Sequence, residues 1–293
     1  MAAADTLAPR PPGISTQDWD EWRKCLEEGR LSPLEETEKA HALMLRYSPT
    51  SMPSLGKGGY TDGVMLCKDL AERRFVVAKP SKAKPGYYRA ALFAEEFARK
   101  SEDIDGITPI LAAYNTGMFK RMLILPLHKG GSIFTSHISK LKEDEFPSFS
   151  IDDLEAYSRQ GAGTLKELEK RGLVLGDIKC ENAYVVDGKL YFADFDFGYV
   201  EGERHFLVTE TIMNRSPHVI LQSRYNHLND RWAFGCMLFK MYTGLDLFPS
   251  SASSKDMQSM SEQLDQIQKE LGPIPASVIE SGDLGSEFFE KVT

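Results

Sequence analysis

The stretch LVLGDIKCENAYVVDGKLYFADFDFG, residues 173–198, decides how the chain is best interpreted. Its centre places Asp187-Gly188 between two short apolar runs, AYVV and KLYF, which is among the strongest sequence signals for a β-hairpin. A turn centred on these two residues pairs the flanking strands so that Asn182 lies beside Asp194. We therefore expect an amide oxygen and a carboxylate to converge at one end of a two-stranded ribbon.

This convergence predicts a magnesium site next to the short loop that precedes the hairpin. Mg²⁺ is a hard cation that prefers oxygen ligands, so Asn182 and Asp194 suit it. Asp177 lies upstream on the same loop and can reach this space as a general base or as a group that orients a hydroxyl. Asp196 is the alternative to Asp194 as a ligand, but the spacing of the hairpin favours Asp194.

Further polar residues lie upstream, where strand-like patterns alternate with one helix. LGKGGYTDGV, residues 55–64, puts glycines between two strands, where backbone N–H groups can approach phosphates without a clash from Cβ. FVVAKP follows as a β-branched strand that ends near Lys79, whose ammonium can neutralise the phosphates of a nucleotide. Taken alone, each signal also fits an ordinary hairpin or a solvated lysine.

The helix predicted over about 87–100 offers two glutamates as ion-pair partners of Lys79. Its apolar residues recur at i, i+3, i+4 and i+7, and both Glu95 and Glu96 lie near this stripe. Glu96 is narrowly preferred because it lies closer to the edge of the stripe. Two solvated glutamates on a helix surface remain an alternative interpretation.

Composition restricts the class of protein. The 293 residues include 43 acidic and 35 basic side chains, and the formal charge of −8 argues against a general nucleic-acid or anionic-membrane binder. The longest strongly apolar stretch, residues 122–127, is far short of a membrane span, and the first residues lack the pattern of a signal peptide. We expect a soluble intracellular protein, cytoplasmic or nuclear.

The order of the patterns predicts an α+β protein with two lobes. Residues 1–49 form an N-terminal extension with an Ala/Pro-rich, disordered start followed by helices, and SPTSMPS (48–54) reads as a linker. The main domain then covers 50–293. Its β-rich N-lobe extends over about 50–126, and its mostly helical C-lobe over about 127–293.

Together these motifs make the chain resemble a eukaryotic-type protein kinase. The glycine-rich loop, the V-x-x-K strand, the helix glutamate, D-x-K-x-x-N and D-F-x occur in the order of that family. LILPLHKGGSI (123–133) resembles the hinge, and TIMNRSPHVIL (211–221) resembles the substrate-docking segment. NDRWAFG (229–235) resembles the central helix of the C-lobe with its D-x-W-x-x-G motif. The likeness covers about residues 50–293.

Within the family, the chain is similar to the group that holds cyclin-dependent, LAMMER-type and SR-protein kinases. Arg215, the GLDLFP sequence and residues 264–289 carry this likeness, and the last stretch is most similar to SR-protein kinases. An amphipathic helix followed by a Pro-containing loop would explain residues 264–289 equally well without any subfamily relation.

The resemblance implies roles for individual residues in binding ATP and Mg²⁺. Asp177 would orient and deprotonate the substrate hydroxyl, and Lys179 would stabilise the transferring phosphate. Asn182 and Asp194 would hold Mg²⁺. The implied nucleotide-binding positions are Leu55, Gly56, Gly58, Gly59, Val64, Lys79 oriented by Glu96, and the hinge residues Pro126 and His128.

The chain departs from the family pattern at three places. Leu175-Gly176 stands where the family has His-Arg, His218 stands where it has Glu, and the chain ends where the last two C-lobe helices would begin. These departures favour the alternative of a pseudokinase that binds nucleotide or acts as a scaffold. A small-molecule kinase would explain Gly176-Asp177 but not the docking segment.

The leading expectation is nevertheless an ATP- and Mg²⁺-dependent protein kinase that acts on Ser and Thr. Lys179 and Thr211 resemble the Ser/Thr pattern of the family. The implied partner is a protein substrate, arginine-rich in the SR-type case, and neither nucleic acid nor membrane. The shortened C-lobe would expose an apolar surface near Phe288 and Phe289 that a protein partner could cover.

Overall fold

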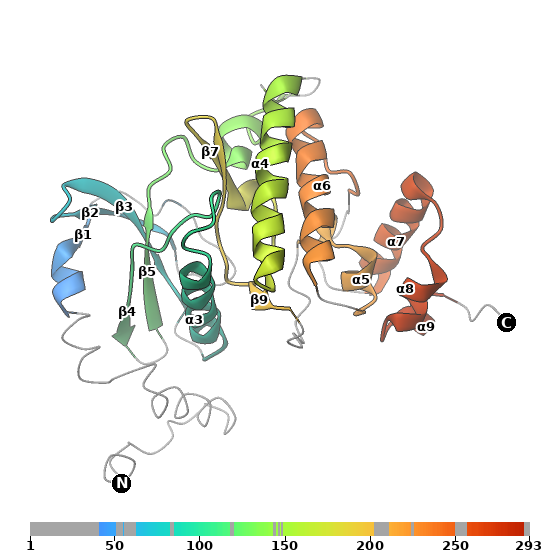
Figure 1. Cartoon of the computed structure of the whole chain (residues 1–293), viewed down its shortest axis with the longest axis horizontal. Helices are drawn as coiled ribbons and strands as arrows, with labels where there is room; N and C mark the ends of the chain where they lie inside the picture. The colour runs from blue at the N-terminus through green and yellow to red at the C-terminus, as the bar shows by residue number, and fades with distance from the viewer. Residues whose placement is uncertain are drawn as a thin grey trace, which may run out of the picture. The chain divides into compact units, whose positions relative to one another are not determined.

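The structure is a computed structural model and combines an antiparallel sheet with a group of helices (Figure 1). It describes residues 41–50, 55, 63–82, 85–117, 120–142, 145, 147, 149–201, 211–223, 226–249 and 257–289. No helix among these residues has the length and apolar character needed to span a bilayer.

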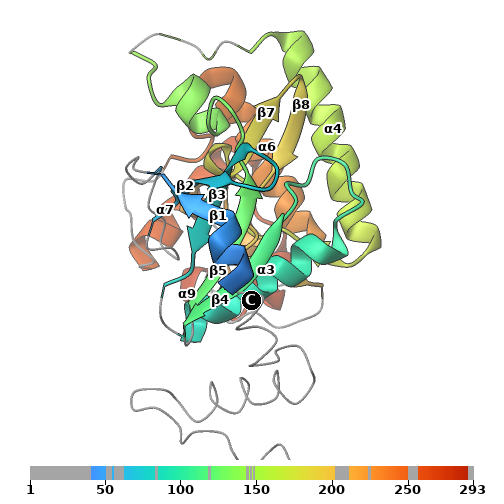
Figure 2. The same cartoon turned by 90° about the vertical axis from the view of Figure 1, so that its left-hand side faces the viewer.

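The sheet has the strand order β1-β2-β3-β5-β4, with every neighbouring pair antiparallel (Figure 2). Strands β3 and β5 pair without a shift in register, and successive side chains of β3 project from opposite faces of the sheet. One face buries an apolar cluster that includes Val76 and Ile124, both fully buried. The strands are β1 (Tyr47–Pro49), β2 (Met65–Asp69), β3 (Arg74–Pro80), β4 (Ala112–Gly117) and β5 (Lys120–Pro126).

Strand β1 corrects the linker predicted over 48–54. Ser48 and Pro49 belong to this strand and pair with Lys68 and Cys67 of β2. A run of three residues is too short to give an alternating pattern, and proline is tolerated here because β1 is an edge strand. Residues 51–54 lie outside the described part of the chain.

Helix α3 (Pro85–Lys100) confirms the helix predicted over about 87–100 and begins slightly earlier. Proline is compatible with the first turn of a helix because its missing N–H is not needed there. The buried face of α3 only partly matches the predicted apolar stripe, because Ala94 and Phe97 are buried whereas Ala90 and Phe93 are only partly buried. The other buried side chains of α3 are Tyr88, Ala91 and Ala98.

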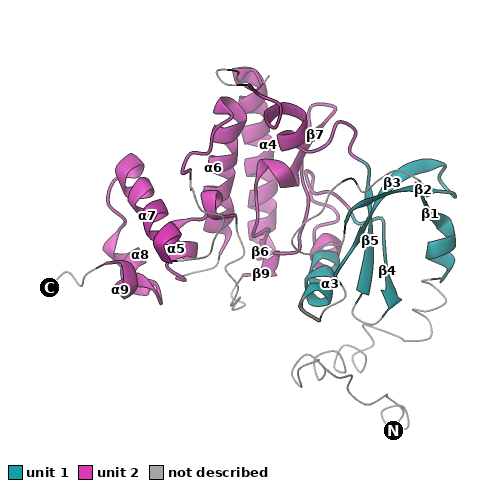
Figure 3. Cartoon of the chain, turned by 180° about the vertical axis from the view of Figure 1, so that it is seen from behind, with its two compact units in different colours: residues 1–95, 110–127 teal, residues 96–109, 128–293 magenta. Residues whose placement is uncertain are grey.

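The contacts divide the chain into two compact units, shown in teal and magenta in Figure 3. The first contains residues 1–95 and 110–127, and therefore the whole sheet. The second contains residues 96–109 and 128–293, and is mostly helical. Helix α3 thus contributes its first part to one unit and its end to the other.

The second unit is organised around α4 (Ile151–Lys170) and α6 (His227–Thr243), which lie side by side in Figure 1. Ser150 begins α4 with a reciprocal capping box to Asp153, and Gly244 ends α6 in the left-handed conformation. The remaining helices are η2 (Phe134–Ile138), η3 (Cys180–Asn182), η4 (Ile212–Asn214), α5 (Pro217–Ile220), α7 (Met257–Leu271), α8 (Ala276–Ser281) and α9 (Gly285–Phe288).

The predicted hairpin is present as β7 (Ala183–Val186) and β8 (Lys189–Phe192), which Figure 2 shows next to α4. Asp187 and Gly188 form its turn with φ of 50° and 75°, as a tight hairpin turn requires. A second short pair, β6 (Leu173–Val174) with β9 (Tyr199–Val200), lies on the two sides of this hairpin in the sequence.

Helices α5 and α7 enclose an apolar cluster at the C-terminal end of the described chain. Its buried members include Ile220, Leu221, Leu264 and Ile267. The sequence predicts an exposed apolar surface near Phe288 and Phe289, but both side chains pack against this cluster and are only partly exposed.

The close approach of α4 and α6 leads to a stability prediction. A Cβ on Gly161 would lie 2.3 Å from the ring of Phe234, so Gly161→Ala should destabilise the fold by about 1–3 kcal/mol through overpacking. Gly163 lies on the same helix with no atom near its missing Cβ, so Gly163→Ala should stabilise it by up to about 1 kcal/mol. Chemical denaturation measures both, and equal effects would contradict the packing argument.

Candidate active site

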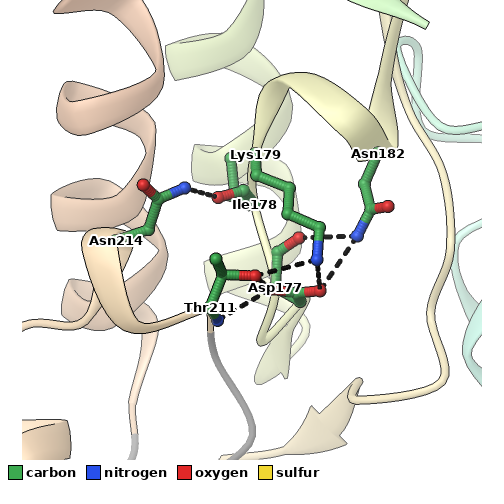
Figure 4. A network of polar contacts seen from close by, with 6 residues as sticks. All are labelled: Asp177, Ile178, Lys179, Asn182, Thr211 and Asn214. Atoms are coloured by element: carbon green, nitrogen blue, oxygen red, sulfur yellow. Dashed lines mark hydrogen bonds and ion pairs between the residues drawn. The ribbon is translucent and has the colours of Figure 1, made fainter. Parts of the chain in front are cut away.

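Asp177 lies at the centre of a polar network on the loop between β6 and η3 (Figure 4). Its side chain is only 4% exposed. One carboxylate oxygen, Oδ2, accepts a hydrogen bond from Lys179 Nζ at 2.6 Å and another from Asn182 Nδ2 at 3.1 Å. Asn182 also donates to the backbone carbonyl of Asp177 at 3.0 Å. The loop thus fixes the three polar side chains of D-x-K-x-x-N against one another.

The other oxygen of Asp177, Oδ1, faces the docking segment, residues 211–221. It accepts hydrogen bonds from the backbone N–H of Thr211 at 3.1 Å and from its hydroxyl at 2.9 Å. Lys179 Nζ donates to the same Thr211 hydroxyl at 2.8 Å, and Asn214 Nδ2 donates to the carbonyl of Ile178 at 2.7 Å. Each oxygen of Asp177 therefore accepts two hydrogen bonds, and the docking segment is tied directly to the loop (Figure 4).

The docking segment is also held from the C-terminal side. Gln263 of α7 is fully buried, and its Nε2 donates to the backbone carbonyl of Ile212. Further along, Ser216 begins α5 and donates its hydroxyl proton to Asn229 at 2.8 Å. His218, where the sequence departs from the family pattern, lies half-buried on α5.

The backbone before Asp177 has a conformation that requires glycine. Gly176 has a φ of +77°, and a Cβ there would lie 2.3 Å from the carbonyl oxygen of Phe197. Asp230 of α6 accepts the N–H groups of Leu175 at 2.6 Å and of Gly176 at 2.9 Å. Complete burial raises the pKa of Asp230 to about 7, although these two donors act in the opposite direction. The glycine at position 176 thus has a local structural reason.

The backbone register brings Asn182 beside Asp194 as predicted. The carbonyl of Asn182 accepts the N–H of Ala193 at 2.9 Å, immediately before Asp194. In Figure 4 the side-chain oxygen of Asn182 points away from Asp177, because the amide nitrogen makes the contacts to that residue. This oxygen is therefore placed to serve as a ligand for a hard cation.

Two features distinguish Asp194 from the alternative ligand Asp196. Asp194 has a left-handed φ of 65°, which costs a non-glycine residue on the order of 1–3 kcal/mol and is concentrated at functional sites. The phenylalanine that follows Asp194, Phe195, is buried and stacks on Phe97 with ring centroids 5.0 Å apart, whereas the one that follows Asp196, Phe197, is only partly buried. These observations favour Asp194, whose role as a ligand stays a prediction.

No group of three or more His, Cys, Asp or Glu side chains that could bind a metal occurs in the described part of the chain. The residues present still fit Mg²⁺, because Asn182 and Asp194 both carry side-chain oxygens that can serve as metal ligands. The backbone hydrogen bond between Asn182 and Ala193 brings the two residues next to each other. Such a pair is compatible with a cation that also takes oxygen ligands from a bound phosphate and from water.

The glycine-rich loop is only described at its two ends. Gly56, Gly58 and Gly59 lie outside the described residues. The backbone N–H of Leu55 donates to the carbonyl of Val64 at 2.7 Å, so the chain on the two sides of the loop is paired. The predicted role of these five positions in binding nucleotide remains untested.

Lys79 lies on β3 opposite Leu123 of β5, and its pairing with a glutamate of α3 stays a prediction. Glu96, the preferred candidate, forms an ion pair with Lys100 at 2.9 Å, and both side chains are about 40% exposed. Glu95 instead forms an ion pair with Arg121 of β5, whose side chain is only 4% exposed. Nothing in the sequence marks Arg121 as a member of the site.

The predicted hinge lies where the two compact units meet in the sequence, between Leu127 and His128. Pro126 ends β5, and its role in binding adenine is untested. The His128 ring lies 4.7 Å from the ring of Tyr184 and 5.6 Å from that of Tyr191, and its Nε2 is 3.1 Å from Thr108 Oγ1. Burial lowers the pKa of His128. Its side chain therefore anchors the chain to the β7–β8 hairpin.

Comparison with known proteins identifies the family. Residues 50–288 match the family described as "Protein kinase domain". The chain belongs to the protein kinase family. The α+β, two-lobed kinase fold predicted from the sequence is thereby confirmed, and the five-stranded sheet and the mostly helical unit correspond to its lobes.

Relatives of this chain include proteins named as serine/threonine and dual-specificity kinases. It is 29% identical to the probable serine/threonine-protein kinase dyrk2 of Dictyostelium discoideum over 65% of this chain and 20% of the relative. It is 26% identical to the serine/threonine-protein kinase ppk15 of Schizosaccharomyces pombe over 81% and 44%, respectively. It is 24% identical to the human dual specificity tyrosine-phosphorylation-regulated kinase 4 over 84% and 46%. The chain spans less than half of the length of these relatives.

Proposed function

We propose that this chain is an ATP- and Mg²⁺-dependent protein kinase that transfers the γ-phosphoryl group of ATP to Ser and Thr hydroxyls. The observation that carries the proposal is the network around Asp177, in which Lys179, Asn182 and Thr211 all contact the one carboxylate. Phosphoryl transfer of this kind needs few covalent steps from the protein, and positioning and charge neutralisation supply most of the rate.

In the proposed reaction, Asp177 accepts the proton of the substrate hydroxyl. Its buried position and its four hydrogen-bond donors hold the carboxylate in one orientation, as a positioned base requires. Lys179 places a positive charge within 2.6 Å of this carboxylate, where it would also contact the transferring phosphate. Bound Mg²⁺ would neutralise phosphate charge, and Asn182 and Asp194 would hold it.

The proposed nucleotide contacts come from the sheet and from the segment that follows it. Lys79 would contact the α- and β-phosphates, and the loop flanked by Leu55 and Val64 would cover them through its backbone. Pro126 and His128 would present backbone groups to the adenine ring. The sequence pattern and the family support these assignments.

The pseudokinase alternative is less well supported. Its arguments are the Leu175-Gly176 departure, His218 and the shortened C-lobe. Of these, Gly176 fits a backbone conformation that other residues strain to adopt. Loss of arginine at this position therefore does not require loss of catalysis. The named relatives are kinases, and none of their names points to a scaffold.

The choice between Ser/Thr and Tyr as the acceptor rests on two sequence positions. Names of relatives include both serine/threonine and dual-specificity kinases, so their names alone leave the acceptor open. We favour Ser and Thr because of the positions of Lys179 and Thr211. The relation to SR-protein kinases and arginine-rich substrates rests on residues 264–289, and the cytoplasmic or nuclear location on composition. A partner protein at the C-terminal surface is likewise a proposal.

Magnesium-dependent nucleotide binding is the experiment that tests the site directly. Asp194→Ala should abolish the increase in melting temperature that ATP causes only in the presence of Mg²⁺, because it removes one of two proposed oxygen ligands. Asp196→Ala is the matched control and should keep most of this increase. Loss of the increase in Asp196→Ala but not in Asp194→Ala would show that Asp196 is the ligand.

A further inference from the structure

A buried polar network connects α3 to the sheet through Arg121. The Nε and Nη2 atoms of Arg121 donate to Glu95 Oε2 at 2.9 and 2.5 Å. Its Nη1 atom donates to Asn115 Oδ1 at 2.9 Å, and the Tyr88 hydroxyl donates to the same oxygen at 3.3 Å. Arg121 thus contacts side chains of β4 and α3 at once, and all of these residues belong to the sheet-containing unit.

Strand register places Arg121 on the same face of the sheet as Lys79. Lys79 is directly opposite Leu123, and residues opposite each other or two apart along a strand project from the same face. Further along the same register, the Ser81 N–H donates to the backbone carbonyl of Arg121 at 2.8 Å. The Arg121 N–H in turn donates to the Ser81 hydroxyl oxygen at 2.9 Å. Lys79 and Arg121 are therefore diagonal neighbours, a relation that typically separates such residues by about 7–8 Å.

The geometry of the Arg121–Glu95 pair leaves part of the carboxylate for a second cation. Both hydrogen bonds from the guanidinium end on Oε2, so the pair does not use Oε1. Glu95 also lies in the buried row of α3, three and seven residues from Ala98 and Tyr88, which are both buried. Glu96 points to a different partner, Lys100, on the exposed side of the helix.

We propose that Arg121 is a positioning residue that fixes Glu95 on the sheet so that its Oε1 atom accepts a hydrogen bond from Lys79 when nucleotide binds. A buried guanidinium needs a charged partner, and charge-assisted hydrogen bonds to a carboxylate are stronger than neutral ones. Placement of α3 then depends on Arg121 rather than on Lys79. This inference rests on the proposed function, because it assumes that Lys79 contacts the nucleotide.

The test compares the affinity for Mg·ATP and the amide hydrogen exchange of α3 among variants of the full chain. Arg121→Met should weaken nucleotide binding about tenfold, within the usual range of coupling between sites, and should speed exchange in α3. Glu95→Gln should weaken binding to a similar extent, and the double variant should be no worse than either. Lys79→Met should weaken binding but leave exchange in α3 unchanged.

Lys100→Met is the matched control, because it removes the cation of the exposed Glu96 pair on the same helix. It should bind Mg·ATP as the wild type does. If Arg121→Met does not unfold cooperatively, Arg121→Lys replaces it. A lysine keeps the buried charge but lacks the planar fork that makes three hydrogen bonds, so a smaller loss of affinity is expected.

Three results would overturn the inference. One is an Arg121 variant that melts at a lower temperature but binds Mg·ATP as the wild type does, which would make Arg121 purely structural. Another is additive loss of affinity in the Arg121→Met/Glu95→Gln variant, since coupled residues are not additive. A third is faster exchange of α3 in Lys79→Met. If the wild type binds no Mg·ATP, the proposed function itself is wrong and the inference falls with it.

Discussion

Asp177→Asn should bind Mg·ATP with nearly the affinity of the wild type and transfer the phosphoryl group about 10²–10⁴-fold more slowly. The substitution keeps the size of the side chain and removes the charge that accepts the hydroxyl proton. The new amide N–H₂ would also face hydrogen-bond donors, either those of Lys179 and Asn182 or those of Thr211. In the wild type these donors bond to the carboxylate. A single-turnover assay with a Ser/Thr protein and a separate binding measurement distinguish these effects.

Asp187→Asn is the matched control for this experiment. It makes the same chemical change at the exposed hairpin turn, where asparagine tolerates the left-handed backbone that Asp187 adopts. It should leave both binding and transfer unchanged. A wild-type chain that binds Mg·ATP but phosphorylates none of several Ser/Thr substrates would instead establish the pseudokinase alternative.

Gly176→Ala should destabilise the chain by about 2–5 kcal/mol. About 1–2 kcal/mol comes from a left-handed backbone at a residue with Cβ, and about 1–3 kcal/mol from overpacking against the carbonyl oxygen of Phe197. Because Gly176 precedes Asp177, the strain should also displace the carboxylate proposed as the base, and an error of 1 Å there can cost about 10²-fold in rate. Chemical denaturation and the transfer assay measure the two effects.

Gly188→Ala separates the two contributions to this loss. Gly188 has nearly the same φ, +75°, but no atom lies within 4 Å of its missing Cβ. It should therefore show only the backbone cost of about 1–2 kcal/mol and keep its activity. An equal loss of stability in both variants would mean that the carbonyl of Phe197 moves aside without cost.

The features that could be predicted best from the sequence are those formed by residues close together in the chain. The Asp187-Gly188 turn sets the register of β7 and β8 by itself, and this register brings the backbone of Asn182 next to the residue before Asp194. The three polar residues of D-x-K-x-x-N meet for a similar reason, since a single turn of η3 connects Lys179 to Asn182.

Contacts between distant segments could not be predicted in the same way. Glu95 and Glu96 are equally polar and both lie beside the apolar stripe, and only Arg121, on a different element, distinguishes them. Likewise, the sequence shows Gly176 only as a departure from the family pattern. The reason for it is the carbonyl of Phe197, which occupies the space that a Cβ would need. The three residues of β1 carry no pattern long enough to be recognised.

The hydrogen bond from Gln263 to the carbonyl of Ile212 connects the chemistry at Asp177 to the C-terminal helices. Thr211, the residue before Ile212, donates twice to the carboxylate of Asp177. Helix α7 therefore helps to hold in place the segment whose Thr211 contacts Asp177, the proposed base. Thermodynamic linkage makes such support mutual, so any ligand that favours the observed position of Thr211 also favours the docked position of α7.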